Sequence, residues 1–160
     1  MAFDAFAARL GDLEIFRGLA PATLSTIARA AERIVFRAGQ PIITADSAGD
    51  AAYLLMGGEA VALDDDTSSG STAKPVAEGS LVGEMAMLIE HDYAVTVVAR
   101  TPVRAIRIPR ETLHRMMAAD PNLAQHFVDR IASRLTRVAV ELRRIDQMLA
   151  LAAEPPQQHA

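Results

Sequence analysis

Gly83 and Glu84 are the residues whose types and spacing are best suited to binding a ligand. Small and apolar residues at helical spacing follow them up to Ile89, which predicts one or two helical turns that begin at the Gly-Glu pair. The start of a helix has backbone N–H groups without intrahelical partners and the positive end of a small dipole, and both favour an anion. Glu84 adds a carboxylate that can accept hydrogen bonds from ligand hydroxyls. The pair therefore predicts a site for a sugar phosphate.

The segment around this pair has the pattern of a small all-β barrel or sandwich. Between residues 34 and 108 the apolar periodicity is short, and Gly, Asp and Pro recur at regular short intervals. Gly57-Gly58 predicts a tight hairpin turn in which both glycines can take a positive φ. The polar segment 64–72 predicts a mobile loop between two strands. Strands are expected near residues 34–37, 41–45, 51–56, 59–63, 75–77, 94–99 and 103–108.

Helices are expected on both sides of this β region. Residues 2–10 form an amphipathic pattern, and Pro21 begins a second helix at a position where its missing N–H costs nothing. A helix over 109–119 is followed by a long one from Pro121 to about residue 150. The long helix carries apolar residues that step alternately by three and four, which predicts a heptad seam against another copy beyond the part that packs on the barrel. The seam consists of Val128, Ile131, Leu135, Val138, Leu142, Ile145 and Leu149.

Composition and charge exclude several classes of function. The net charge of -4 argues against binding to nucleic acid or anionic membranes by bulk attraction. Without cysteine the chain has no disulfide, thiolate metal site or cysteine nucleophile. The four histidines lack ligand spacing, and no nucleophile-base pair stands out, so we expect neither an enzyme nor a metal site. The chain has no signal-peptide pattern and no apolar run of membrane-spanning length, so we expect a cytoplasmic protein that does not contact membranes.

The sequence around Gly83 resembles the phosphate-binding cassette of the cyclic nucleotide-binding domain. This domain is the ligand module of bacterial cAMP receptor-type regulators, protein kinase A regulatory subunits and cyclic nucleotide-gated channels. The matching residues are Gly83, Glu84, Ala86, Leu88, Ala94, Thr96, Val97 and Ala99. Further landmarks of the family follow in the same order at 15–19, 37–43, 46–50 and 53–60, and the resemblance extends to about Leu142.

The resemblance implies a mainly β fold with flanking helices. It is a double-stranded β-helix, or jelly-roll, barrel of eight strands with a long C-terminal helix. The expected organisation is N-terminal helices at 1–33, a β-barrel at 34–108 with the cassette at 82–98, C-terminal helices at 109–150 and a disordered tail at 151–160. The chain has no cofactor in this interpretation, and cAMP or cGMP is the possible ligand.

The resemblance also implies which residues contact the ligand. They are Gly83, Glu84, Met85, Ala86, Tyr93 and Ala94, and we add His91 from the same loop as a further candidate contact. In the family an arginine that pairs with the cyclic phosphate stands ten residues after the cassette glycine, and here that position holds Tyr93. A hydrogen bond to a charged group contributes about 1.5–3 kcal/mol, so its loss predicts binding weakened about tenfold to a hundredfold or more. Tyr93 could keep one neutral hydrogen bond or stack on a base.

His91 lies two residues earlier in the same loop as Tyr93. It could restore a cation at mildly acid pH, although a solvated loop residue is the simpler interpretation. Glu84 likewise has a structural alternative, since it could act only on the dipole of its own helix. The surrounding match favours the ligand role for Glu84.

Two functions follow from this sequence. The first is a stand-alone sensor or regulatory domain that binds a cyclic nucleotide weakly, or a related ligand, and signals through its C-terminal helices to an effector protein of unknown identity. The alternative is a degenerate fold that acts as a ligand-free oligomerisation or protein-interaction module. In both cases the resemblance implies a homodimer through the last helix, since the seam residues alone do not favour two helices over more. No recognition helix follows that helix, so direct DNA binding is not expected.

Overall fold

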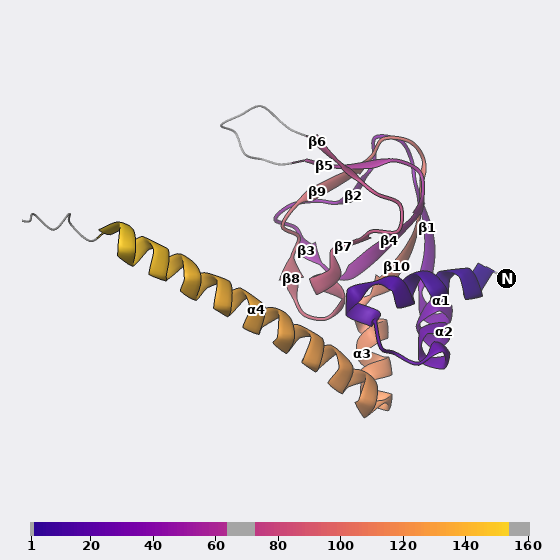
Figure 1. Cartoon of the computed structure of the whole chain (residues 1–160). Helices are drawn as coiled ribbons and strands as arrows, with labels where there is room; N and C mark the ends of the chain where they lie inside the picture. The colour runs from indigo at the N-terminus through magenta and orange to yellow at the C-terminus, as the bar shows by residue number, and fades with distance from the viewer. Residues whose placement is uncertain (1, 64–72, 154–160) are drawn as a thin grey trace, which may run out of the picture.

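The structure is a computed structural model that describes residues 2–63 and 73–153. Figure 1 shows a β-barrel body with α1, α2 and α3 gathered at one end, and a long helix, α4, that leaves the body and extends away from it. Within the described ranges, no helix combines the length and the hydropathy needed to cross a bilayer. The loop predicted at 64–72 lies outside the described residues, as does residue 154 onward of the predicted disordered tail. Residues 151–153 of that tail belong to α4 instead.

The N-terminal segment folds into two helices joined by a short 3-10 helix. These are α1 (Ala2–Asp12), η1 (Glu14–Phe16) and α2 (Pro21–Ala30). Pro21 occupies the first turn of α2 after an extended Ala20, as the sequence predicts. Leu10, Phe16 and Ile27 are fully buried and form the face of these helices that packs against the barrel.

The strands form two four-stranded sheets and one two-stranded sheet, all with antiparallel pairing. The first sheet has the order β1 (Glu32–Phe36), β10 (Val103–Pro109), β4 (Ala51–Gly57) and β7 (Leu81–Val82). The second has the order β2 (Pro41–Ile43), β9 (Thr96–Ala99), β5 (Ala60–Leu63) and β6 (Ala73–Val76). The short sheet pairs β3 (Ala48–Gly49) with β8 (His91–Asp92).

Strands that are distant in sequence are neighbours in these sheets. β1 pairs with β10, and β2 pairs with β9, which is the jelly-roll arrangement. The sequence prediction missed β3, β7 and β8, because two residues are too few to produce a detectable alternation. The predicted tight turn at Gly57-Gly58 is present, but it is not a hairpin, because β4 and β5 on either side of it belong to different four-stranded sheets and do not pair with each other. Only Gly58 has a positive φ, of 95°, whereas Gly57 ends β4.

Two apolar clusters fill the molecule. One lies between the helices and the first sheet, where the rings of Phe16 and Phe127 meet edge to face with centroids 5.7 Å apart. The other lies inside the barrel and includes Ala86 and Tyr93. The cassette therefore closes the core of the barrel and is not an independent surface loop.

The C-terminal region comprises α3 (Arg110–Ala119) and α4 (Pro121–Ala153). Leu123 and Phe127 are the buried residues of α4, and Ile131 packs partly against the same cluster. From Leu135 onward the apolar residues of the seam are exposed. At 33 residues and about 1.5 Å per residue, α4 is roughly 50 Å long, and its distal part projects beyond the barrel (Figure 1).

Replacing Phe127 tests how strongly α4 is fixed to the body. We expect Phe127→Ala to lower the free energy of unfolding by about 3–5 kcal/mol, because it leaves a cavity beside Phe16. Met148→Ala, on the exposed distal part of the same helix, should change it by less than about 0.5 kcal/mol. Urea denaturation measures both values. Similar losses for the two variants would contradict the assignment of Phe127 to the core.

Candidate functional site

The cassette begins at a glycine in the left-handed region of backbone space. Gly83 has φ 71° and ψ 29° and caps η2 (Glu84–Met87), a single 3-10 helix rather than the predicted one or two helical turns up to Ile89. A Cβ at Gly83 would lie 2.7 Å from Cε1 of Tyr93 and 3.2 Å from the carbonyl oxygen of Ala51. Only glycine satisfies both the positive φ and this close approach.

All seven ligand-contact residues predicted from the sequence line one cavity. The cavity has a volume of about 330 Å³ and lies between the cassette and the strands around it. The remaining lining residues are apolar and belong to β2, to β7 and to the position immediately before β9. Its lining residues are Ile43, Leu81, Val82, Gly83, Glu84, Met85, Ala86, His91, Tyr93, Ala94 and Val95.

Glu84 presents a buried carboxylate oxygen at this cavity. Its side chain is 24% exposed, and Oε1 lies 2.7 Å from Nη2 of Arg134 on α4. The two groups form an ion pair by distance, but their geometry is not that of a hydrogen bond, and the described residues provide no hydrogen bond to this oxygen. Oε1 therefore retains the capacity to accept a hydrogen bond from a ligand hydroxyl.

The contact with Arg134 is one of three that arginines of α4 make with the rest of the domain. Arg134 pairs with Glu84, Arg137 lies 3.0 Å from Glu14, and Arg130 donates to the carbonyl of Arg17. Heptad spacing identifies the faces of a helix but not the element beside each turn, so these partners could not be read from the sequence.

Tyr93 is a core residue in this structure. It is 8% exposed, and its hydroxyl donates to the carbonyl oxygen of Ala51 at 2.7 Å. Its ring lies against the backbone of Gly83 and Gly49, where added Cβ atoms would come within 2.7 and 3.0 Å of Cε1. Burial raises the pKa of Tyr93, and the nearby Tyr53 adds to the shift. The geometry favours a structural role for this side chain, and a ligand contact stays a prediction.

The other predicted residues occupy the rim and the floor of the cavity. His91 and Ala94 are exposed, and His91 belongs to β8. Ala86 is buried, and its N–H donates to the carbonyl of Gly83 at 3.0 Å, so that this N–H is already used in the turn. Within the described residues, no group of three or more His, Cys, Asp or Glu side chains could hold a metal ion.

Two residues of α3 that the sequence analysis did not single out hold the end of the cassette. Nη1 of Arg110 donates to the carbonyls of Gly49, Ala86 and Ile89 at 2.7, 3.1 and 3.1 Å. The Nε2 atom of His114 lies 2.6 Å from the carbonyl oxygen of Leu88. Arg110 and His114 are four residues apart on one helix face. That spacing is the only sequence signal for this clamp, and it is weak.

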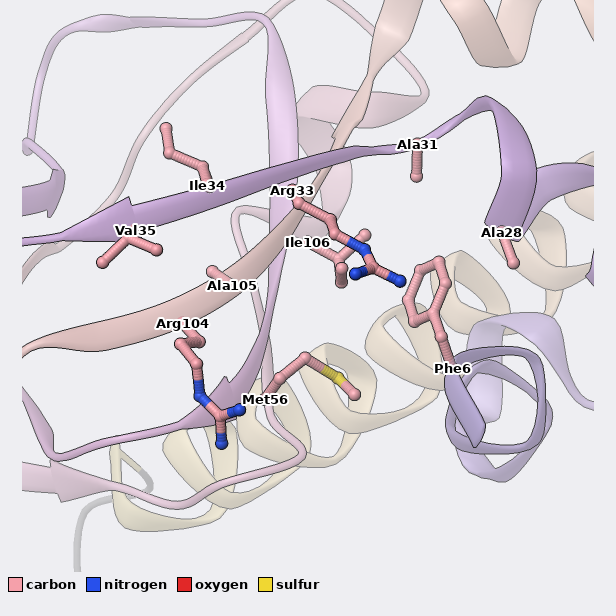
Figure 2. A pocket seen from close by; sticks show the side chains of 10 residues that line it. All are labelled: Phe6, Ala28, Ala31, Arg33, Ile34, Val35, Met56, Arg104, Ala105 and Ile106. Carbon is pink, nitrogen blue, oxygen red and sulfur yellow. The ribbon is translucent and has the colours of Figure 1, made fainter. Parts of the chain in front are cut away.

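A second cavity lies on the other side of the first sheet, between it and the N-terminal helices. Figure 2 shows this cavity of about 250 Å³, with Phe6 and Met56 on its apolar walls and the side chains of Arg33 and Arg104 beside it. It contains none of the residues predicted to contact a ligand. We assign the candidate site to the cassette cavity because all seven predicted contact residues line it, including Glu84 with its buried carboxylate oxygen.

Removing the Tyr93 hydroxyl tests its structural role. Tyr93→Phe should lower the free energy of unfolding by about 1 kcal/mol, because the carbonyl of Ala51 loses a buried donor. The raised pKa means that the folded protein keeps this proton at a pH where the unfolded chain has lost it. Wild-type stability should therefore fall as pH rises through the ordinary tyrosine pKa of about 10, and this fall should be smaller in Tyr93→Phe. Urea denaturation between pH 7 and 11 measures both effects; equal pH profiles would contradict the buried hydroxyl.

The sequence of this chain matches those of known proteins. The family model described as the cyclic nucleotide-binding domain matches residues 33–120, more than half of the chain. The cAMP-dependent protein kinase regulatory subunit of Aspergillus fumigatus is 34% identical over 115 residues, which cover 72% of this chain. The match spans only 27% of the length of that relative.

Solved structures agree with the fold. A cyclic nucleotide-binding-like protein from Brucella abortus superimposes with a TM-score of 0.65 at 28% identity, covering 71% of this chain and 98% of its own. The N-terminal domain of a transcriptional regulator from Streptomyces coelicolor, at 17% identity, shares the fold with a TM-score of 0.72 and covers 95% of this chain and 99% of its own. The predicted jelly-roll fold with flanking helices is confirmed. With its Gly-Glu cassette closing a jelly-roll barrel, this chain belongs to the cyclic nucleotide-binding domain family.

Proposed function

We propose that this chain is a regulatory domain that binds a cyclic nucleotide in the cassette cavity and signals through α4. The buried Oε1 of Glu84 carries the proposal. This oxygen is removed from water and has an ion-pair contact with Arg134 but no hydrogen bond in the described residues, and a ligand hydroxyl at this position would add one. The apolar walls and the volume of about 330 Å³ suit a small ligand with a few polar contacts.

Binding is expected to be weak relative to a site with an arginine at position 93. Tyr93 brings no positive charge, and its hydroxyl already donates to the carbonyl of Ala51. A phosphate bound here would also lie near the carboxylate of Glu84, so that repulsion between the two anions lowers affinity unless a cation lies between them. Cyclic AMP and cyclic GMP are the ligands to test first, since the relative from A. fumigatus is named as a cAMP-dependent protein kinase regulatory subunit.

The output of this domain is proposed to pass through a homodimer formed by α4. Leu135, Leu142 and Leu149 belong to the predicted heptad seam and are exposed on the part of α4 that extends beyond the barrel. A regular apolar stripe of this kind is stabilised when two helices pack side by side. An effector protein of unknown identity would then bind the paired helices in a way that depends on their position.

A second candidate function is a ligand-free oligomerisation module. It is favoured by the buried position of Tyr93, which fills the place of a ligand-binding arginine with a core side chain. In this alternative the cassette is only a structural closure of the barrel, and α4 alone carries the function.

Calorimetric titration with cAMP and with cGMP separates the two candidates. We expect the wild type to bind at least one of them and Glu84→Gln to bind at least about tenfold more weakly, because it loses a charged acceptor. Glu14→Gln is the matched control, since Glu14 also pairs with an arginine of α4 but does not line the cavity. Absence of binding by the wild type would favour the ligand-free module.

Sedimentation equilibrium tests the proposed dimer. The wild type should sediment as a dimer, and Leu142→Glu should shift it to a monomer, because the seam would then bury a charge. Val140→Glu is the matched control, since Val140 is an exposed apolar residue of α4 outside the seam. A dimer that is equally weakened by both substitutions would contradict a specific seam.

A further inference from the structure

The lining of the cassette cavity includes no arginine or lysine. Its lining residues carry one full negative charge, on Glu84, and one side chain that can become positive, His91. A ligand with a phosphate would therefore need a cation from outside the lining. Two arginines, Arg110 of α3 and Arg134 of α4, are bonded or ion-paired with lining residues in the described part of the chain.

Arg110 is poorly suited to this role. Its Nη1 atom is shared by three backbone carbonyls that hold the cassette to β3. Moving it toward a ligand would leave these carbonyls without their donor, which is unfavourable in a partly buried setting. Arg110 is therefore a structural clamp.

Arg134 has the position and the freedom that Arg110 lacks. It is 41% exposed, its Nη2 lies 2.7 Å from Oε1 of Glu84, and its Nη1 lies 3.7 Å from the sulfur of Met85. A thioether sulfur is a weak acceptor, and the ion pair with Glu84 lacks hydrogen-bond geometry. Neither contact uses the full donor capacity of the guanidinium, which presents five N–H groups in a planar fork.

We propose that Arg134 provides the cation for the phosphate of the ligand, in place of the arginine that Tyr93 replaces. The inference rests on the proposed function. In it, the positive charge of Arg134 offsets the repulsion between the ligand phosphate and the carboxylate of Glu84. A ligand hydroxyl donates to Oε1 of Glu84, and the guanidinium of Arg134 exchanges its contact with the sulfur of Met85 for phosphate oxygens. Charge-assisted hydrogen bonds of this kind are stronger than the contact they replace.

Because Arg134 lies on α4, this exchange couples ligand binding to the position of that helix. Arg134 is immediately followed by Leu135, the first exposed apolar residue of the seam after Ile131. A ligand that attracts the guanidinium favours the position of α4 in which Arg134 reaches the cavity. Ligand affinity and pairing of α4 are then thermodynamically linked, and each alters the other by the same factor.

The opposing role is a latch, in which Arg134 only neutralises Glu84 and competes with the ligand. The two roles predict opposite effects. If Arg134 binds the ligand phosphate, its removal weakens binding and reduces the dependence of binding on salt. If it is a latch, its removal leaves affinity unchanged or increases it.

Titration calorimetry with cAMP at several salt concentrations distinguishes these roles. Arg134→Gln should bind cAMP at least about tenfold more weakly than the wild type at low salt, and its affinity should fall less steeply as salt is added. Arg134→Lys keeps the charge without the planar fork and should bind with intermediate affinity. Arg137→Gln is the matched control, one turn further along α4 and paired with Glu14 outside the cavity, and it should behave as the wild type.

Three results would overturn the inference. Binding of cAMP by Arg134→Gln that equals or exceeds that of the wild type would assign Arg134 to a latch and leave the proposed function intact. Weaker binding with an unchanged salt dependence would assign it to a structural role on α4. A wild type that binds neither cAMP nor cGMP would overturn the proposed function together with this inference.

Discussion

The ring of Tyr93 beneath the cassette is the constraint on which the geometry of the site depends. It lies against two glycines whose Cβ atoms it would exclude, and its hydroxyl is bonded to the carbonyl of Ala51 on β4. One side chain thereby connects the cassette, the β3 turn and the central strand of the first sheet. The cassette keeps its shape without an arginine at this position, because the packing of the Tyr93 ring and a neutral hydrogen bond hold it.

Two helices hold the cassette from outside, and they do so by different physical means. α3 binds its far end through backbone carbonyls, with Arg110 and His114 as donor and partner. α4 reaches the carboxylate of Glu84 through the half-exposed side chain of Arg134. Several short hydrogen bonds make the first attachment rigid, whereas the second is a single ion pair between two long side chains. The arrangement makes α4 the element that can respond to a change at the cavity.

The same helix has two surfaces with different environments. Near its start, Leu123 and Phe127 are buried against the body, so this part of α4 belongs to the domain. Beyond Leu135 the apolar residues have no cover within the described chain. Arg134 lies at the boundary between the two parts. A displacement there would be carried along the distal part, because sharp kinks in a helix need a local cause such as proline or glycine, and residues 135–153 contain neither.

By itself, the sequence determined the fold class and the order of the longer elements, and its resemblance to the family singled out the candidate residues that line one cavity in the structure. Apolar periodicity, turn residues and the cassette pattern are local signals, and local signals determine local structure. Only the tertiary structure decided where α4 passes the barrel, that Arg134 rather than another arginine meets Glu84, and that the hydroxyl of Tyr93 points into the core. The two-residue strands and the contacts of Arg110 with the cassette could not be predicted from the sequence either. These contacts join residues 21 to 61 positions apart and depend on how the elements pack together rather than on the spacing of residues within any one of them.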